Sequence, residues 1–354
     1  MVKQRIRLRS RKSAFGRDLG LLPIKEGDQE LEDLAKQVED LKKQLSGMSF
    51  AFASLHKAID DVMWYQVMQD TATVDKVVFC GPPPANTLAQ SPQDKGNPLK
   101  INAYTFIKKG IDTTKKYPLL VLVHGGVHSD FSTGSAHIVK ELVNQGYIVI
   151  APDYRGSTGY GEQFYKFIDY GGLEVEDCYA ARNFMLESCP LVDPERVGIL
   201  GWSHGGLITL MNIFNHPEAY KVAYAGVPVS DLVARMGYKG PAYQSIFAAP
   251  YHLGKTAVED PWEYRRRSPA WNADKLQTPL LIHTNTNDED VNCLEVEHLI
   301  KALKAAGKDF EYKIYQNEPG GHVFNRIDTE AAKASRREIW AFLAKYLNPP
   351  FPLN

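Results

Sequence analysis

From about residue 100 onward, short and nearly continuous apolar segments alternate with helical patterns, and this alternation restricts the fold more than any other feature. The apolar segments include Leu119–Val123, Tyr147–Ala151, Val197–Leu200 and Leu280–His283. Strands that are apolar on both faces are typical of a parallel sheet covered by helices on two sides. The pattern predicts a fold of the α/β class over residues 100–354: a doubly wound, mostly parallel sheet with helices on both faces.

Residues 27–70 carry helical patterns and predict an N-terminal helical extension. Apolar residues recur at steps of three and four from Leu31 to Leu45, and a second pattern runs from Leu55 to Val67 after Gly47. We expect two helices, or one kinked helix. The first pattern covers about two heptads, fewer than the three or four of an independent coiled coil. Packing of the extension on its own body and formation of a homo-oligomer through these helices are the two alternatives.

Two further segments complete the predicted organisation. Residues 1–26 form a basic N-terminal arm, since the first 18 residues hold seven lysine and arginine residues but only Asp18 as an acid. We expect this arm to be solvated or docked on the body. Residues 71–99 predict a strand followed by a loop rich in proline and glycine.

Charge, apolar content and cysteine usage argue against several classes of protein. The 41 Lys and Arg residues nearly balance the 42 Asp and Glu residues, so the net charge of −1 does not favour nucleic acid or a membrane surface as a partner. No apolar stretch reaches the roughly 18 residues of a membrane span, and no secretory signal is visible. The four cysteines are scattered. We expect a soluble, cytoplasmic protein that binds neither nucleic acid nor membranes.

The segment Gly201–Gly206 (GWSHGG) matches the pattern GxSxG. In this pattern small residues flank a serine, so that a sharp turn between a strand and a helix can expose the hydroxyl group. An apolar strand pattern precedes the segment and a helical pattern follows it, as the turn requires. We therefore predict that Ser203 is a nucleophile.

A nucleophilic serine needs a base, and the base needs a third group that holds its tautomer. The expected chain order is serine, acid, histidine. The strand ending at His283 is followed by the polar loop that contains Asp288, and the strand that ends at Tyr315 is followed by a loop with His322 after two glycines. Because catalytic groups in such sheets lie at the carboxyl ends of strands, we predict that Asp288 and His322 complete a triad with Ser203.

Backbone N–H groups must meet the oxyanion that forms during acyl transfer. The strand that ends at Val123 is followed by His124-Gly125-Gly126, and His204 follows the nucleophile at the start of a helix. We predict that the N–H groups of Gly126 and His204 form the oxyanion hole. Neither a cysteine nor a carboxylate accompanies the nearby histidines in a metal-binding pattern, so we predict no metal and no cofactor.

Residues 100–350 resemble the catalytic domain of the prolyl oligopeptidase family of α/β-hydrolases. The most specific match is Tyr154–Gly161 (YRGSTGYG), a run that most other esterases and lipases lack. The other matching segments are His124–Gly126, Asp193–Val197, Gly201–Gly206, Ser268–Pro269, Asp288–Val291 and Gly321–His322. The resemblance implies an α/β-hydrolase fold and places the family's triad on Ser203, Asp288 and His322, which the spacing had already indicated.

Several features depart from the family's pattern. Full-length oligopeptidases have a β-propeller of several hundred residues before this domain, whereas only about 100 residues precede it here. In the acylaminoacyl branch a proline usually follows HGG, where this chain has Val127. The residue two positions after the catalytic acid is often Arg or Asn, where this chain has Asp290. The resemblance is thus to an acylaminoacyl-peptidase-like domain without a propeller.

Residues 231–271 are rich in aromatic side chains. In this fold the segment between the strand after the nucleophile and the strand before the acid commonly forms the acyl or side-chain pocket. Core packing is the alternative for most of these aromatics. The predicted substrate-binding residues, from this segment and from the motifs, are Val127, Trp202, Tyr243, Phe247, Tyr251 and Asp290.

The sequence thus predicts a serine hydrolase that cleaves amide or ester bonds through an acyl-enzyme. By resemblance, we expect a peptidase-like hydrolase of short peptides or N-acylated amino-acid derivatives. A carboxylesterase acting on small acyl or aryl esters is the alternative, because the same triad can cleave both bonds. A scaffold protein with a vestigial hydrolase domain is a more remote alternative.

Overall fold

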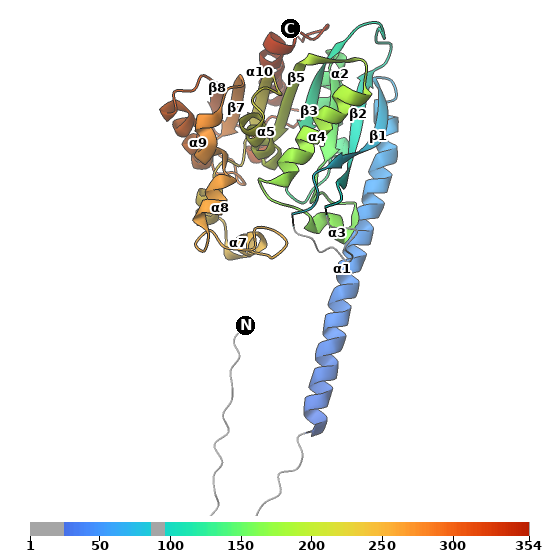
Figure 1. Ribbon diagram of the computed structural model, residues 1–354, viewed down its shortest axis with the longest axis vertical. Helices are drawn as coiled ribbons and strands as arrows, with labels where there is room; N and C mark the ends of the chain where they lie inside the picture. The colour runs from blue at the N-terminus through green and yellow to red at the C-terminus, as the bar shows by residue number, and fades with distance from the viewer. Residues whose placement is uncertain (1–24, 86–95, 354) are drawn as a thin grey trace, which may run out of the picture. The chain divides into compact units, whose positions relative to one another are not determined.

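The computed structural model of the protein describes residues 25–85 and 96–353, which include one eight-stranded sheet (Figure 1). Apart from residues 25 and 26, the predicted basic arm lies outside the described residues, as do residues 86–95 of the predicted loop. The strands are β1 Ala72–Gly81, β2 Leu99–Lys108, β3 Tyr117–Val123, β4 Ile148–Asp153, β5 Val192–Trp202, β6 Val222–Gly226, β7 Leu280–Asn285 and β8 Glu311–Tyr315.

The strand order is β1-β2-β4-β3-β5-β6-β7-β8. The strands from β3 to β8 pair in parallel, while β1 pairs with β2 and β2 pairs with β4 in antiparallel fashion. This arrangement confirms the predicted mostly parallel sheet. Because parallel strands need crossover connections, the helices between them cover both faces.

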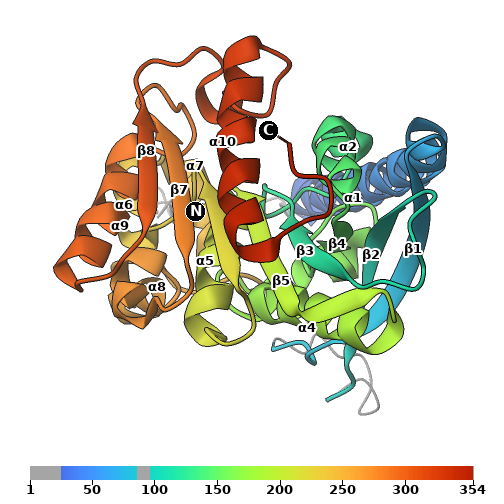
Figure 2. The ribbon, with the colours of Figure 1, turned by 90° about the horizontal axis from the view of Figure 1, so that it is seen from above.

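Helices line both faces of the sheet (Figure 2). One hydrophobic core lies between the sheet and α4, α5 and α9, and a second lies between the sheet and α1, α2 and α10. The helices are α1 Lys25–Met68, α2 Ala136–Asn144, α3 Gly161–Lys166, α4 Leu173–Ser188, α5 His204–Asn215, α6 Leu232–Tyr238, α7 Pro241–Phe247, α8 Pro261–Arg266, α9 Cys293–Ala305 and α10 Glu330–Leu347. Among them, none combines the length and the apolar character needed to cross a membrane.

The helical extension is one helix, α1, that continues through Gly47. The chain divides into two compact units between Ser49 and Phe50, so the second unit contains the last turns of α1, strand β1 and the α/β body. In this second unit Trp64 is fully buried and its ring stacks on Phe131, with the ring centroids 5.3 Å apart. The C-terminal part of α1 is therefore a component of the body's second core.

A buried ion pair also holds these last turns of α1. The ammonium group of Lys57 lies 2.8 Å from a carboxylate oxygen of Asp153, at the end of β4, and 3.2 Å from one of Asp130. Burial alone would lower the pKa of Lys57, but the two carboxylates hold it above its usual value. The lysine is thus charged and paired inside the body, as a buried charge requires.

Candidate active site

Ser203 occupies a sharp turn between β5, which ends at Trp202, and α5, which begins at His204. Its backbone has φ 60° and ψ −122°, a conformation that is strained for a residue with a side chain. Small neighbours make the turn possible, because a Cβ atom on Gly201 would lie 2.5 Å from the carbonyl oxygen of Gly205. The Ser203 N–H donates to the carbonyl of Gly226 at 2.9 Å. The structure therefore places Ser203 in the predicted strand-turn-helix context.

Asp288 and His322 are in direct contact beyond the ends of β7 and β8. The Nδ1 atom of His322 lies 2.9 and 2.8 Å from the two carboxylate oxygens of Asp288. One of these oxygens also accepts the backbone N–H groups of Asp290 at 2.9 Å and Val291 at 2.8 Å. The Asp288 side chain is fully buried. A carboxylate fixed in this way accepts the Nδ1 proton and leaves Nε2 as the basic nitrogen.

The glycine turn after β3 lies directly against Ser203. A Cβ atom on Gly125 would lie 3.2 Å from the Ser203 Cβ atom and 2.9 Å from the Trp202 carbonyl oxygen. Gly126 has φ 72°, which favours glycine. The Tyr154 hydroxyl lies 3.1 Å from the carbonyl oxygens of both His124 and Gly126 and can donate to either one. The turn is thus held close to the nucleophile.

The other predicted oxyanion residue, His204, begins helix α5. The first N–H groups of a helix have no acceptor within the helix and are available to an anion. The His204 side chain is buried, with its ring centroid 4.4 Å from that of Tyr170 and its Nε2 atom 3.3 Å from a carboxylate oxygen of Glu174. The backbone of His204, rather than its imidazole, is therefore the group available to a reacting carbonyl.

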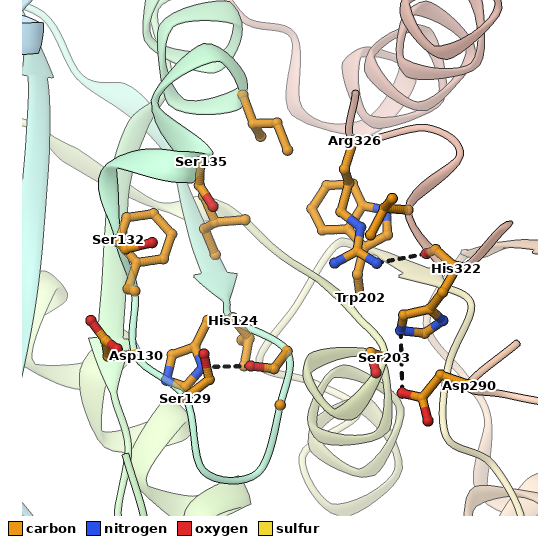
Figure 3. A pocket seen from close by; sticks show the side chains of 17 residues that line it. His124, Ser129, Asp130, Ser132, Ser135, Trp202, Ser203, Asp290, His322 and Arg326 are labelled. Atoms are coloured by element: carbon orange, nitrogen blue, oxygen red, sulfur yellow. Dashed lines mark hydrogen bonds and ion pairs between the residues drawn. The ribbon is translucent and has the colours of Figure 1, made fainter. Parts of the chain in front are cut away.

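A cavity of about 370 Å³ joins these elements (Figure 3). Ser203, His322 and Gly126 all line it, and so do two of the predicted substrate-binding residues, Trp202 and Asp290. The complete lining is Leu122, Val123, His124, Gly125, Gly126, Ser129, Asp130, Phe131, Ser132, Ser135, Ile138, Trp202, Ser203, Asp290, His322, Val323 and Arg326.

Four other predicted substrate-binding residues do not line this cavity: Val127, Tyr243, Phe247 and Tyr251. Val127 is partly buried against the first core, and Phe247 is part of that core. Tyr243, on α7, accepts a 2.8 Å hydrogen bond from the Nε–H group of Arg235. Tyr243 and Phe247 therefore pack on each other, and Tyr243 also supports a buried arginine.

Asp290 differs from Asp288 in its surroundings, although both are close to His322. One Asp290 oxygen lies 2.5 Å from the Lys239 ammonium and 3.1 Å from the Arg235 guanidinium, and the other lies 3.7 Å from His322 Nε2. Burial raises the pKa of Asp290, but the hydrogen bond from Lys239 and the charge of Arg235 outweigh this effect and hold it below its usual value. Asp290 is a carboxylate whose charge is largely neutralised by two cations.

Two parts of the cavity were not predicted from the sequence. Arg326 follows His322 by four residues, and the segment from Ser129 to Ser135 forms the opposite wall. Its place in the same loop, four residues after the predicted histidine, is the sequence signal that could have indicated Arg326. No group of three or more His, Cys, Asp or Glu side chains in residues 25–85 and 96–353 is placed to hold a metal ion.

Comparisons with known proteins agree with this architecture. The model of the prolyl oligopeptidase family matches residues 133–350. The acylamino-acid-releasing enzyme of Arabidopsis thaliana is 27% identical over 250 residues, which are 69% of this chain and 32% of that protein. The dipeptidyl aminopeptidase BIII of Pseudoxanthomonas mexicana is 31% identical over 235 residues, 65% of this chain and 33% of that protein.

The fold is likewise similar to solved structures. The acylaminoacyl peptidase of Pyrococcus horikoshii has a TM-score of 0.65 and 20% identity, with 78% of this chain and 42% of that chain covered. This chain spans about a third of the length of the curated relatives that it matches. The family model covers more than half of the chain, so the protein belongs to the prolyl oligopeptidase family.

Proposed function

We propose that the protein is a serine peptidase-like hydrolase that cleaves amide bonds in short peptides or N-acylated amino-acid derivatives. The observation that carries this proposal is one cavity lined by Ser203, at a strained turn, and by His322, whose Nδ1 contacts the buried Asp288. Two relatives, an acylamino-acid-releasing enzyme and a dipeptidyl aminopeptidase, have names that refer to substrates of this kind.

The geometry supports a two-step acyl transfer. The Ser203 Oγ atom attacks the carbonyl carbon while His322 Nε2 accepts its proton, and Asp288 stabilises the resulting imidazolium. The backbone N–H groups of Gly126 and His204 bind the oxyanion. His322 then gives the proton to the leaving amine, and a water molecule, activated in turn by His322, hydrolyses the acyl-enzyme.

The size of the cavity favours small substrates. A volume of about 370 Å³ is near the lower end of the roughly 300 to 1,000 Å³ of small-molecule sites, so it accommodates a few amino-acid residues.

The cytoplasmic location expected from the sequence is also a proposal. The four cysteines are free thiols, as is usual in proteins of a reducing compartment.

Ester hydrolysis is the second candidate activity. The same nucleophile and oxyanion donors act on an ester, but an ester's leaving group departs with less help from His322 than an amine does. We therefore propose to measure kcat/KM for N-acetyl-aminoacyl p-nitroanilides and for p-nitrophenyl esters of the same acyl groups, with Ser203→Ala as the control. Anilide turnover comparable to ester turnover supports the peptidase proposal. Ester turnover with negligible anilide cleavage supports a carboxylesterase.

The scaffold alternative makes a different prediction in the same experiment. A vestigial hydrolase domain turns over neither series above the rate of a reaction without enzyme. Turnover that exceeds this rate but is equal in the wild type and in Ser203→Ala would contradict the proposed nucleophile. The reaction without enzyme therefore separates the two outcomes in one set of measurements.

A further inference from the structure

Arg326 is a cation in the cavity that no carboxylate neutralises. Its guanidinium points into the cavity that Ser203 and His322 line (Figure 3). One of its nitrogens, Nη2, donates to the backbone carbonyl of His322 at 2.6 Å. Its Nε–H group is buried and has no hydrogen-bond partner. Asp288 and Asp290 affect Arg326 only at longer range, and no ion pair joins it to a carboxylate of the described residues.

Arg326 is half-buried, and the fully buried arginines show what a guanidinium inside this protein usually contacts. Four arginines of the described residues are buried, and each has a carboxylate within 3.1 Å. These pairs are Arg155–Asp177, Arg235–Asp290, Arg267–Asp169 and Arg336–Glu141. The charge of the half-buried Arg326 is only partly solvated, and its buried Nε–H donor has no acceptor, so both carry a cost in free energy. The missing anion is therefore most simply supplied by a ligand.

The position of Arg326 relative to His322 indicates which part of the substrate carries this anion. His322 Nε2 gives its proton to the leaving amine, so the leaving group must lie beside His322. Arg326 is bonded to the backbone of the same residue. A guanidinium binds a carboxylate through two parallel hydrogen bonds. In Arg326 the end formed by Nη1 and Nη2, rather than the buried Nε–H group, faces the cavity and is suited to this geometry. Leu122 and Phe131, two buried apolar side chains that line the same cavity, strengthen such a contact because they exclude water.

We propose that Arg326 binds a carboxylate on the leaving group, so that the substrate is an N-acyl amino acid or a short peptide cleaved next to its free C-terminus. This inference rests on the proposed function. Hydrolysis then consumes one water, the acyl carbon passes from nitrogen to Ser203 Oγ and then to the water oxygen, and the proton from Ser203 goes through His322 to the departing amino acid. Asp290 does not oppose binding of this anion, because Lys239 and Arg235 neutralise it.

The test compares N-acyl dipeptides that have a free C-terminal carboxylate with the same compounds as carboxamides. We expect the wild type to prefer the carboxylate, and Arg326→Gln to reduce the ratio of the two kcat/KM values by about 10- to 100-fold, the effect of a charged hydrogen bond. A shift of His322 caused by the substitution lowers both values together, so the ratio reports on the carboxylate alone. Arg326→Lys is expected to retain part of the preference. Arg337→Gln, at an exposed arginine of α10, is the matched control and should keep the wild-type ratio.

The outcomes separate this inference from the proposed function. A wild type that cleaves both compounds equally, or a ratio that is unchanged in Arg326→Gln, overturns the role of Arg326 and leaves the hydrolase proposal intact. Absence of turnover that depends on Ser203, with any amide or ester, overturns the proposed function and the inference that rests on it.

A second and independent observation concerns the solvent-facing side of α1. Ten apolar residues follow one another along this helix at alternating steps of three and four, and each is between 43% and 68% exposed. In the first compact unit they are Leu31, Leu34, Val38, Leu41, Leu45 and Met48, and in the second they are Phe52, Leu55, Ile59 and Val62. We call these ten residues the α1 seam. They occupy the a and d positions of more than four consecutive heptads, which is enough for an independent coiled coil.

The body does not use the seam. In the second unit, the residues of α1 that are buried are Lys57, Asp60, Trp64 and Met68, none of which belongs to the seam. An amphipathic helix on its own body needs only one apolar face. The last turns of α1 bury one face, which contains Trp64 and Met68, and expose a second face that is apolar.

We propose that the α1 seam pairs in parallel with the seam of a second copy of this chain. The neighbouring e and g positions from Leu31 to Val62 carry few charges, with Lys42 as the one lysine and no acid, so nothing in the seam's borders repels an identical helix. Within a parallel coiled coil, leucine at three of the five d positions and a β-branched residue, Val38 or Ile59, at two of the five a positions favour two strands. The seams of two copies bury on the order of 1,000 Å², near the size at which an interface is stable.

The test uses the full-length protein at micromolar concentration in analytical ultracentrifugation. We expect a dimer, and a monomer for the double variant Leu34→Asp/Leu41→Asp. The control Lys36→Asp/Lys43→Asp, on the side of the heptad opposite the seam, should remain dimeric. In a Cys80→Ser background, Leu41→Cys should form a disulfide between copies under mild oxidation, and Lys43→Cys should not. A monomeric wild type, a dimer that survives the seam substitutions, or a failure of Leu41→Cys to crosslink would overturn the pairing.

Discussion

The loops at the carboxyl ends of the strands line the active-site cavity, whereas no residue of the segment 231–271 does, and the two regions are built differently. The strand-end loops place Ser203, His322 and Gly126 on one cavity. In segment 231–271 the aromatic side chains pack on each other, as in the contact of Tyr243 with Phe247, whose ring centroids are 4.9 Å apart. The comparison shows that the end of a strand determines the position of the side chain that follows it. In an aromatic-rich segment between strands, the rings can instead pack on one another. Substitutions in the two regions should therefore have very different effects.

The largest effect is expected from Asp288→Asn. The amide cannot hold His322 in the tautomer that leaves Nε2 basic, so kcat should fall by about 10⁴-fold. Asp290→Asn is the matched control, because it makes the same change from a carboxylate to an amide two residues away. The nearest Asp290 oxygen lies 3.7 Å from His322 Nε2. We expect it to cost less than about ten-fold in kcat/KM. Steady-state kinetics on one ester substrate measure both, and equal losses would show that Asp288 has no special role.

A smaller loss is expected from Gly126→Ala. The φ of 72° strains a residue with a Cβ atom, and that Cβ atom would lie 2.9 Å from the Cβ atom of Ser129. The N–H group of residue 126 should therefore move out of line with the oxyanion, and loss of one such donor costs about 10²- to 10³-fold in kcat. Gly237→Ala, on α6 in the contrasting segment, has no atom within 4 Å of the added Cβ and should retain wild-type kcat. An unaffected Gly126→Ala enzyme would place the oxyanion donor elsewhere.

The smallest effect is expected when the same change, tyrosine to phenylalanine, is made in each of the two regions. Tyr154→Phe removes the hydroxyl that lies 3.1 Å from the carbonyls of His124 and Gly126, so the turn should loosen and kcat should fall by about 3- to 10-fold. Tyr251→Phe removes a hydroxyl from the segment 231–271, and kcat should stay within about two-fold of wild type. Parallel measurements of kcat and of melting temperature separate a loosened turn from a loss of global stability. If Tyr251→Phe proved the more damaging change, segment 231–271 would be part of the site.

The strands could be predicted because a strand that is buried on both faces appears in the sequence as an apolar run. The functional residues after them could be predicted because the residue that follows such a run lies at the carboxyl end of the sheet. The contacts of Tyr243 and Phe247 could not be predicted, because the number of aromatic residues in a segment does not indicate which neighbour each ring packs against. Arg326 was missed for a similar reason: nothing in the sequence shows that its expected carboxylate partner is absent. The helical pattern of α1 was interpreted as interrupted at Gly47, yet one glycine costs only about 1 kcal/mol in a helix, and a long helix tolerates it.

The central claim is that Ser203 is a nucleophile activated by His322. The most direct test is labelling with a fluorophosphonate probe, followed by mass spectrometry of the proteolytic peptides. We predict one adduct, on Ser203, that is absent in Ser203→Ala and is formed much more slowly in His322→Gln, while Ser245→Ala, at an exposed serine of α7, labels like the wild type. An unlabelled wild type, or an adduct that persists in Ser203→Ala, would contradict the account.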